Sequence, residues 1–209
     1  MIFRKNLIAG SMLALAVLGG AAANAAVVTK TYNVEFDSLL DPFAGATPPV
    51  SPLLASFTLT FDPTISYVND TADIVTNELN VPVDSPIGFS SGVDTSTGDL
   101  YVSIGGLQNG PGLVGFDSND FVLQLRFAGG DLSKPSLPLC SDPGFSCGGL
   151  PTTYASGYTS TRYPDSLFLG LVATVTPAPE PATWAMMLTG FAGLGATLRM
   201  RRRTLAAAA

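Results

Sequence analysis

The sequence predicts an all-β protein, an antiparallel β-sandwich of jelly-roll type, for the central part of the chain. Apolar and polar residues alternate with a period of two in Ser56–Phe61 and again in Phe121–Phe127, which is the spacing of strands with one buried face. Turn signals such as Asp62-Pro63 and Asn109-Gly110 separate such segments. No long stretch here carries the helical period of 3.6. Strands joined by Gly, Pro and Asp turns favour packed antiparallel sheets.

Further strands are expected on weaker patterns. Leu167–Val175 is apolar on nearly both faces, which predicts a buried strand. Val27–Phe36, Ile74–Val81 and Leu100–Ile104 are weaker candidates. The segment Pro135–Tyr163 is rich in Pro, Ser, Gly and Tyr, and we expect it to form a long surface loop rather than a separate domain.

The N-terminal 25 residues have the pattern of a secretory signal peptide. Arg4 and Lys5 precede about twelve apolar or small residues, too few to span a bilayer comfortably. Ala23-Asn24-Ala25 then supplies the small-residue pattern that a signal peptidase cleaves, after Ala25. The sequence therefore predicts an exported protein, with a retained N-terminal anchor as the alternative.

The chain has two cysteines, Cys140 and Cys147, and no histidine. In the oxidising compartment that an exported protein enters, two nearby cysteines usually pair, so we expect a disulfide across the Pro143-Gly144 turn. A zinc site lacks further ligands, and no metal site is expected. Asp94–Asp99 does not have the ligand spacing of an EF-hand, although Ca²⁺ binding by an acidic domain stays open.

Negative charge is concentrated in the central part of the chain. Residues 26–176 hold fifteen Asp and Glu against four Lys and Arg, a net charge of −11, whereas the whole chain carries −6. Such a domain repels nucleic acid and anionic membrane surfaces at long range. We therefore expect no nucleic-acid partner.

The C-terminal segment has the features of a membrane-sorting tail. Three prolines between Pro177 and Pro181 favour an extended, stiff linker. Ala182–Leu198 carries no charge, and about 17 residues make a helix of roughly 25 Å, the lower limit for a membrane span. Trp184 stands where an interfacial anchor is expected. The basic cluster that follows predicts a cytoplasmic end and an exterior body; its members are Arg199, Arg201, Arg202 and Arg203.

This tail resembles a PEP-CTERM sorting domain of the variant written PEPxxWAMMxxGF. The resemblance rests on Pro179-Glu180-Pro181, Trp184–Leu188, Gly190-Phe191 and the arginine cluster, in that order, and covers about the last 26 residues before the alanine tail. It implies processing near Pro179-Glu180-Pro181 by an exosortase, a membrane-embedded cysteine protease-transpeptidase of Gram-negative bacteria. It also implies a link to exopolysaccharide and biofilm production.

Together these patterns divide the chain into four parts. Residues 1–25 are the expected signal peptide, 26–176 the exported β-sandwich, 177–203 the sorting segment with its single transmembrane helix, and 204–209 an alanine-rich tail. The expected function is that of a non-enzymatic surface or extracellular-matrix protein without a cofactor. It would be anchored transiently in the inner membrane, then released to the cell surface or matrix, with exopolysaccharide as a candidate partner.

The alternative is a secreted carbohydrate-active enzyme or carbohydrate-binding module that uses paired carboxylates. The absence of histidine excludes Ser-His-Asp and Cys-His machinery, but a glycosidase needs only two carboxyl groups. The available aspartates all lie in turn contexts, where we expect them to bind local backbone. The tyrosines that could stack on sugar lie in one segment. These candidates are Asp94, Asp99, Asp117, Asp120 and Asp131, and Tyr154, Tyr158 and Tyr163.

Overall fold

The computed structural model describes residues 27–179, apart from 143, 146 and 148–151, and residues 187–189 and 191 of the tail. Over the described residues of 27–179 the chain is all-β, with one short 3₁₀ turn, η1 (Ala128–Gly130). The all-β prediction is confirmed. The strands are β1 (Val28–Leu40), β2 (Leu53–Phe61), β3 (Tyr67–Asp70), β4 (Ile74–Leu79), β5 (Ile87–Val93), β6 (Leu100–Gly106), β7 (Asp120–Phe127), β8 (Pro135–Ser136), β9 (Gly157–Ser160) and β10 (Tyr163–Pro177).

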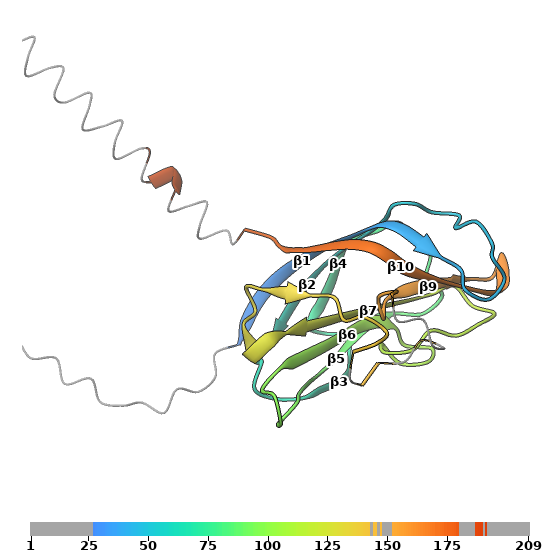
Figure 1. Cartoon of the computed structure of the whole chain (residues 1–209). Coiled ribbons are helices and arrows are strands. Elements are labelled where there is room, and N and C mark those ends of the chain that lie inside the picture. The colour runs from blue at the N-terminus through green and yellow to red at the C-terminus, as the bar shows by residue number, and fades with distance from the viewer. Residues whose placement is uncertain are drawn as a thin grey trace, which may run out of the picture.

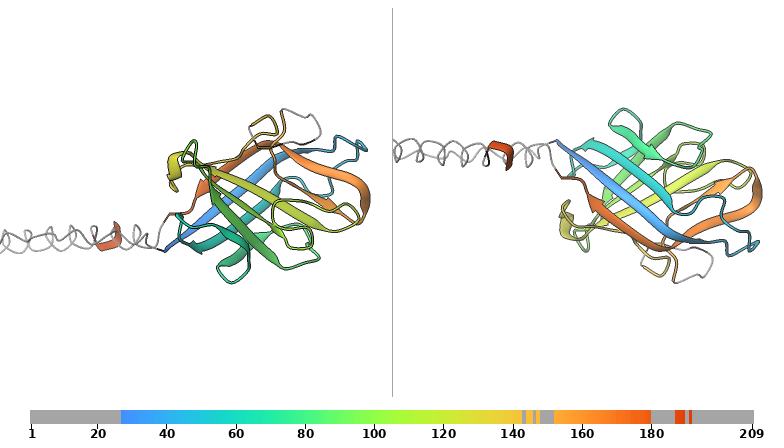
Figure 2. Two further views of the ribbon diagram at one scale, coloured as in Figure 1. Left: turned by 90° about the horizontal axis from the view of Figure 1, so that it is seen from below. Right: turned by 90° about the horizontal axis from the view of Figure 1, so that it is seen from above.

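The strands form one antiparallel sheet that is nearly closed. Its order is β3-β5-β6-β7-β9-β10-β1-β2-β4, and β8 adds to β7 outside this path. The sheet curls on itself (Figures 1 and 2), and β4 approaches β5, so that the two ends of the path come close together. The sequence predicted separate sheets of a jelly roll. The structure differs because β9 and β10 carry the hydrogen bonds without a break between the two sides.

Aromatic and aliphatic side chains from the inner faces of all the long strands fill the interior. Alternate residues of β1, among them Tyr32 and Phe36, are fully buried. They meet residues from the opposite side of the curled sheet: the Tyr32 and Phe127 ring centroids are 5.3 Å apart, and those of Phe57 and Phe121 are 5.8 Å apart. Apolar residues therefore alternate with polar ones in these strands because every second side chain points into one apolar interior, which both sides of the sheet share.

A cluster of three aromatic rings packs where the ends of the sheet approach each other. Phe61 of β2, Tyr67 of β3 and Phe89 of β5 lie with ring centroids 5.2–6.3 Å apart. The Tyr67 hydroxyl also accepts a hydrogen bond from the backbone N–H of Asp62, at 3.0 Å. These contacts close the interior at a place where β3 and β4 share no backbone ladder.

The predicted strands exist, with wider bounds for most of them. The patterns at Val27–Phe36, Ser56–Phe61, Ile74–Val81, Leu100–Ile104 and Phe121–Phe127 fall on β1, β2, β4, β6 and β7. β10 is longer than the predicted Leu167–Val175 and is not buried on both faces, because Leu171 and Val172 are exposed. β3 and β5 were not predicted; their sequences are short or interrupted by Gly and Ser.

The prediction of one long surface loop over Pro135–Tyr163 is wrong. The segment contributes β8 and β9, and β9 lies between β7 and β10 in the middle of the sheet. Gly157 explains why the pattern was missed. A Cβ at this residue would overlap the carbonyl oxygen of Phe168 on β10, so a strand that must pass so closely carries glycine in place of an apolar residue.

The start of β1 and the end of β10 lie side by side, so the chain enters and leaves the body at the same place. Tyr32 pairs with Pro177 in the β1–β10 ladder, and the N–H of Ala178 donates to the carbonyl oxygen of Thr31 at 2.8 Å. Figure 1 shows the start of β1 in blue and the end of β10 in orange at the same end of the body. Pro177, the expected first residue of the linker, is thus the last residue of a strand.

Replacing Gly157 with alanine should destabilise the body because the added methyl group collides with the backbone of β10. We expect the free energy of unfolding to fall by about 1–3 kcal/mol, the usual cost of forcing extra atoms into a packed region. Chemical denaturation of Gly157→Ala against the unaltered chain measures it. Gly92→Ala is the control, since its Cβ would meet no atom closer than Ser66 Oγ at 3.8 Å. Equal stability of the two variants would contradict the close passage of β9.

Candidate functional site

A groove on the outside of the sheet is the candidate site among the described residues. It has a volume of about 590 Å³ and lies over β6, β7 and β10, between three loops. We call it the aromatic groove and define it by four rings and two polar side chains. These residues are Phe43, Tyr101, Phe116, Phe145, Ser103 and Gln124. None of the described residues that line it is charged.

The first pair of rings comes from two loops far apart in the sequence. Phe43 follows β1 and Phe116 precedes β7, and their rings meet edge to face with centroids 6.1 Å apart. They are 56% and 50% exposed. The two rings touch each other, but about half of each residue remains exposed to water. This uncovered apolar surface is available to a ligand.

The second pair depends on the disulfide. Tyr101 of β6 and Phe145 have ring centroids 5.8 Å apart. Cys140 and Cys147 form a disulfide, which confirms the prediction. Phe145 lies within the loop that this disulfide closes. The loop is also tied to its surroundings, since the N–H of Cys140 donates to the carbonyl oxygen of Thr153 at 2.8 Å. The disulfide therefore holds one wall of the aromatic groove.

Polar side chains form part of the floor. The Ser103 hydroxyl donates to Gln124 Oε1 at 2.6 Å, and the Gln124 amide Nε2 lies 3.5 Å from the carbonyl oxygen of Gly112. The backbone N–H of Gln124 donates to the buried hydroxyl of Ser156 at 2.9 Å. The two side-chain bonds hold the Gln124 amide in one orientation at the floor of the groove, where the residue is 7% exposed, and Ser103 and Gln124 each keep an acceptor lone pair.

Asp41 shapes the loop that carries Phe43. Its carboxylate accepts hydrogen bonds from the backbone N–H groups of Phe43, Ala44 and Ala46 at 3.1, 3.2 and 2.9 Å. Burial of the carboxyl group acts to raise the pKa of Asp41. The hydrogen bonds from Ala46, the Ser166 hydroxyl, Ala44 and Phe43 outweigh it and hold the pKa below its ordinary value.

Asp120 shapes the loop that carries Phe116, again by accepting backbone hydrogen bonds. The buried carboxylate accepts hydrogen bonds from the N–H of Gly115 at 3.2 Å and of Phe121 at 2.8 Å. The carbonyl oxygen of Gly115 accepts from Thr159 Oγ1 at 2.8 Å and from Ser118 Oγ at 2.9 Å. Gly115, the residue before Phe116, is therefore fixed by its N–H to β7 and by its carbonyl oxygen to β9.

Two other candidate aspartates, Asp94 and Asp131, stabilise turns. Asp94 accepts hydrogen bonds from the N–H and the hydroxyl of Ser96, and the hydroxyl bond is the first cause of its lowered pKa. Asp131 does the same with Ser133, also lowering its pKa, and pairs with Lys134 at 3.2 Å. The prediction of local turn bonding is confirmed for both residues.

Asp99 departs from that prediction because its partners are distant in sequence. Its carboxylate accepts hydrogen bonds from the N–H of Gly129 and from Arg126 Nε, each at 2.8 Å, and Arg126 Nη2 lies 2.6 Å away. The Gly129 bond, followed by the Arg126 guanidinium, holds the pKa of Asp99 below its usual range. Through its bond with Gly129, Asp99 connects η1 to the turn between β5 and β6, and through Arg126 it connects this turn to β7.

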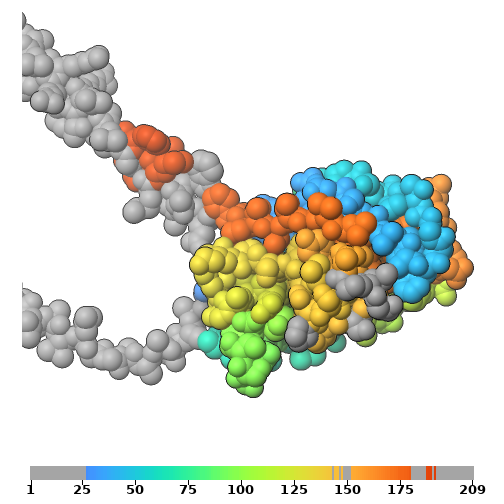
Figure 3. All heavy atoms as spheres, in the orientation of Figure 1, coloured from blue at the N-terminus to red at the C-terminus, as the bar shows by residue number. Residues whose placement is uncertain are grey.

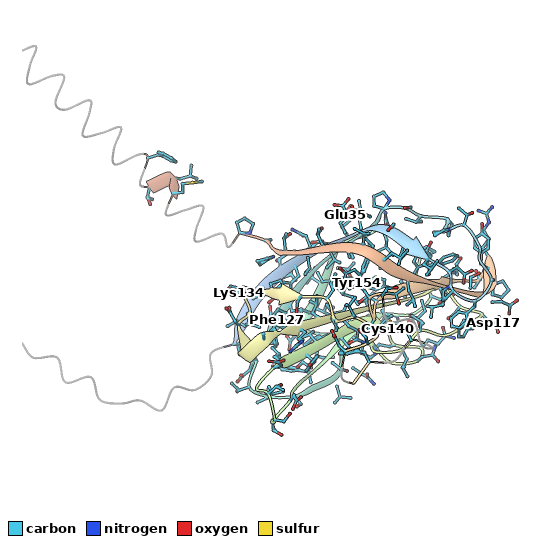
Figure 4. The ribbon with its side chains drawn as sticks, viewed as in Figure 1. Glu35, Asp117, Phe127, Lys134, Cys140 and Tyr154 are labelled. Atoms are coloured by element: carbon cyan, nitrogen blue, oxygen red, sulfur yellow. A yellow bond between two sulfur atoms is a disulfide. The ribbon has the colours of Figure 1, made fainter. Side chains whose placement is uncertain are left out.

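The structure does not bring the candidate aspartates together. Figure 4 shows Asp117 at the end of the body opposite to Lys134, the partner of Asp131. Asp120 lies near Asp117 in sequence, at the start of β7, whereas Asp94 and Asp99 flank the turn before β6. The five carboxylates therefore divide between two ends of the sheet, and at one end Asp94 lies close enough to Asp99 for its charge to act on it. Among the described residues, no cluster of three or more Asp, Glu, Cys or His has the arrangement of a metal site.

The three candidate tyrosines do not form a stacking surface. Tyr158 is 1% exposed, packs on Phe168 at 5.0 Å, and its burial raises the pKa of its hydroxyl to about 12. Tyr154 packs edge-on against Phe36, and Tyr163 against Phe168. The rings that do face the groove were missed by sequence reasoning. For the three phenylalanines of the groove, the sequence offered one signal: each lies in a segment rich in Gly, Pro, Ser and Asp, where no strand pattern explains a large apolar side chain.

Most of the predicted sorting residues lie outside the described part of the chain. Pro179 is exposed, two residues after the end of β10. Of the expected span, only residues 187–189 and 191 are described, and they are helical. No helix within the described ranges is long and apolar enough to cross a membrane. Outside these ranges lie Ala23, Ala25, Glu180, Pro181, Trp184, Arg199, Arg201, Arg202 and Arg203.

Comparison of the chain with protein-family models, with curated proteins and with solved structures finds no match.

Replacing Asp41 with asparagine should make the body less stable at neutral pH and remove part of its acid sensitivity. The pKa of Asp41 is lowered in the folded state, so its stabilising contribution is complete above the unfolded value of about 3.9 and is lost as the pH falls through the folded value. Denaturation midpoints of both proteins, measured from pH 7 to pH 2, should converge at the acid end.

The exposed Asp37 of β1, the strand that ends just before Asp41, provides the control, because Asp37→Asn removes a carboxylate without removing the three bonds to the Phe43 loop. A constant difference between Asp41→Asn and the unaltered protein across this pH range would show that the Asp41 charge does not hold the loop.

Proposed function

We propose that this protein is a non-enzymatic, exported surface or extracellular-matrix protein that an exosortase processes and that takes part in exopolysaccharide or biofilm assembly. The signal peptidase removes residues 1–25, and the tail then holds the body at the outer side of the inner membrane of a Gram-negative bacterium. Processing near Pro179 releases residues 26 to about 179 to the cell surface or matrix. In this proposal the sorting residues are a substrate, and no cofactor takes part.

One observation carries the proposal: the order of the Pro179-Glu180-Pro181 motif, an uncharged segment with Trp184 at its start, and four closely spaced arginines. Each part alone is common. In this order they fit a protease motif outside the membrane, a span and a cytoplasmic stop.

The exit of the chain from the sheet supports the same reading. β10 continues through Pro177, and the bond from Ala178 to Thr31 leaves Pro179 as the first exposed residue beyond it. A motif attached so closely to a folded body is presented without a long flexible tether. Proline favours an extended backbone without internal hydrogen bonds, the form in which proteases bind their substrates.

The enzyme alternative has less support. A glycosidase places two carboxyl groups about 5–10 Å apart across a sugar. The candidate aspartates here divide between opposite ends of the sheet, and three of them, Asp94, Asp99 and Asp131, are bound to turn residues or to Arg126. The carbohydrate-binding alternative is favoured by a different feature, the aromatic groove, which needs no carboxylate pair.

Changing Pro179-Glu180-Pro181 to three alanines should block processing in the native host. The variant should stay membrane-bound with Arg199–Arg203 still attached, because the protease no longer binds its motif. Mass spectrometry of the C-terminal peptide measures this directly.

Pro177→Ala is the matched control, since it changes a proline of the same linker that lies in β10, outside the motif. We expect normal processing of this control. An unchanged mature C-terminus in the triple variant would refute exosortase processing at this motif.

A further inference from the structure

The aromatic groove differs in character from the other outer face of the sheet. Across β1, β2 and β4 that face carries hydroxyl and amide side chains bonded to one another, such as Thr31 with Thr58 at 2.7 Å and Ser56 with Asn33 at 2.7 Å. Its polar groups satisfy each other. The groove instead leaves the rings of Phe43 and Phe116 half in water, beside the polar side chains of Ser103 and Gln124.

The rings are held by rigid parts of the fold. Phe43 is positioned through Asp41, Phe116 through the peptide of Gly115, and Phe145 through the disulfide. Figure 3 shows the blue segment after β1 and the yellow and orange segments around the disulfide on the same face of the molecule, and residues of both line the groove. A site whose walls are fixed before the ligand arrives loses little entropy on binding, which favours a genuine ligand site.

Charge restricts the occupant. The described lining residues are uncharged, and the surrounding body carries −11, so an anionic polymer or lipid headgroup would be repelled and would find no cation to bind it. A cationic ligand would find no carboxylate among these lining residues. The occupant that fits is neutral.

The mixture of rings and hydroxyl-binding groups restricts it further. A fatty acyl chain over Ser103 and Gln124 would cover their remaining lone pairs without a partner, at a cost in desolvation. A sugar ring has an apolar face that stacks on an aromatic ring and hydroxyls that bind such groups. The volume of about 590 Å³ lies within the roughly 300–1,000 Å³ range of ligand sites.

We propose that the aromatic groove binds a neutral polysaccharide chain, with sugar rings stacked on the pair Phe43 and Phe116 and on the pair Tyr101 and Phe145, and with sugar hydroxyls bonded to Ser103 and Gln124. The inference rests on the proposed function for the source of the glycan, the exopolysaccharide of the matrix. It assigns the contact to rings and neutral polar groups and makes no use of paired carboxylates.

The test uses the full-length chain in lipid nanodiscs and isothermal titration calorimetry. The probes are the neutral hexasaccharides of cellulose, laminarin, mannan and amylose, the anionic hexamer of alginate, and palmitate as an apolar chain. We expect saturable binding of at least one neutral hexasaccharide and none of the alginate hexamer. Phe43→Ala and Phe116→Ala should each weaken this binding about three- to tenfold, the effect of losing one stacked ring.

Two control variants separate stacking from general damage. Phe116→Tyr keeps the ring and should retain binding, and Val75→Ala removes an exposed apolar side chain from β4, away from the groove, and should change nothing. Far-UV circular dichroism and denaturation midpoints check that all variants are folded. Binding that is unchanged in the double variant Phe43→Ala/Phe116→Ala, binding of palmitate alone, or no binding of any hexasaccharide would each overturn the proposal.

Failure of this proposal is distinguishable from failure of the sorting proposal. Absent glycan binding in a chain that is processed normally in its host overturns the groove alone. Glycan binding by a chain whose mature C-terminus does not depend on Pro179-Glu180-Pro181 overturns the sorting mechanism alone.

Discussion

The pairing of β1 with β10 is the constraint on which the rest of the structure depends. It joins the two ends of the body in one ladder that runs from Tyr32 opposite Pro177 to Leu40 opposite Leu169. Because β10 also pairs with β9, and β1 with β2, this ladder connects the two sides of the curled sheet. It closes the interior around Tyr32 and Phe36, and it brings the start of the tail to the surface beside Thr31.

The groove follows from the same arrangement. β9 can lie between β7 and β10 only because Gly157 permits close passage, and its Thr159 then binds the loop that carries Phe116. The acidic residues of this region act mainly as acceptors for backbone N–H groups, as Asp41 and Asp120 show. Much of the negative charge of the body thus has a structural use, while the groove itself stays neutral and open to a neutral ligand.

The sequence predicted the long strands well and the connections poorly. Strict alternation in Phe121–Phe127 arises because every second residue of β7 packs into the apolar interior, and this alternation is a local signal. β9 has no such signal, since a close approach of two backbones requires glycine and small polar residues. The disulfide was predictable because the chain has only two cysteines. The groove was not, because Phe43, Tyr101, Phe116 and Phe145 meet only through tertiary contacts between β6 and loops distant in sequence.

Hydrogen–deuterium exchange of the full-length chain, followed by mass spectrometry of its peptides, tests the central role of the β1–β10 ladder most directly. Amides in the middle of a sheet exchange only when the strands around them open together, whereas strands at its ends open locally. The account predicts the slowest exchange in peptides that cover Val34–Leu40 and Leu169–Val175, opening together, with faster exchange in β3 and β4. Exchange of β10 as fast as that of β3 would contradict it.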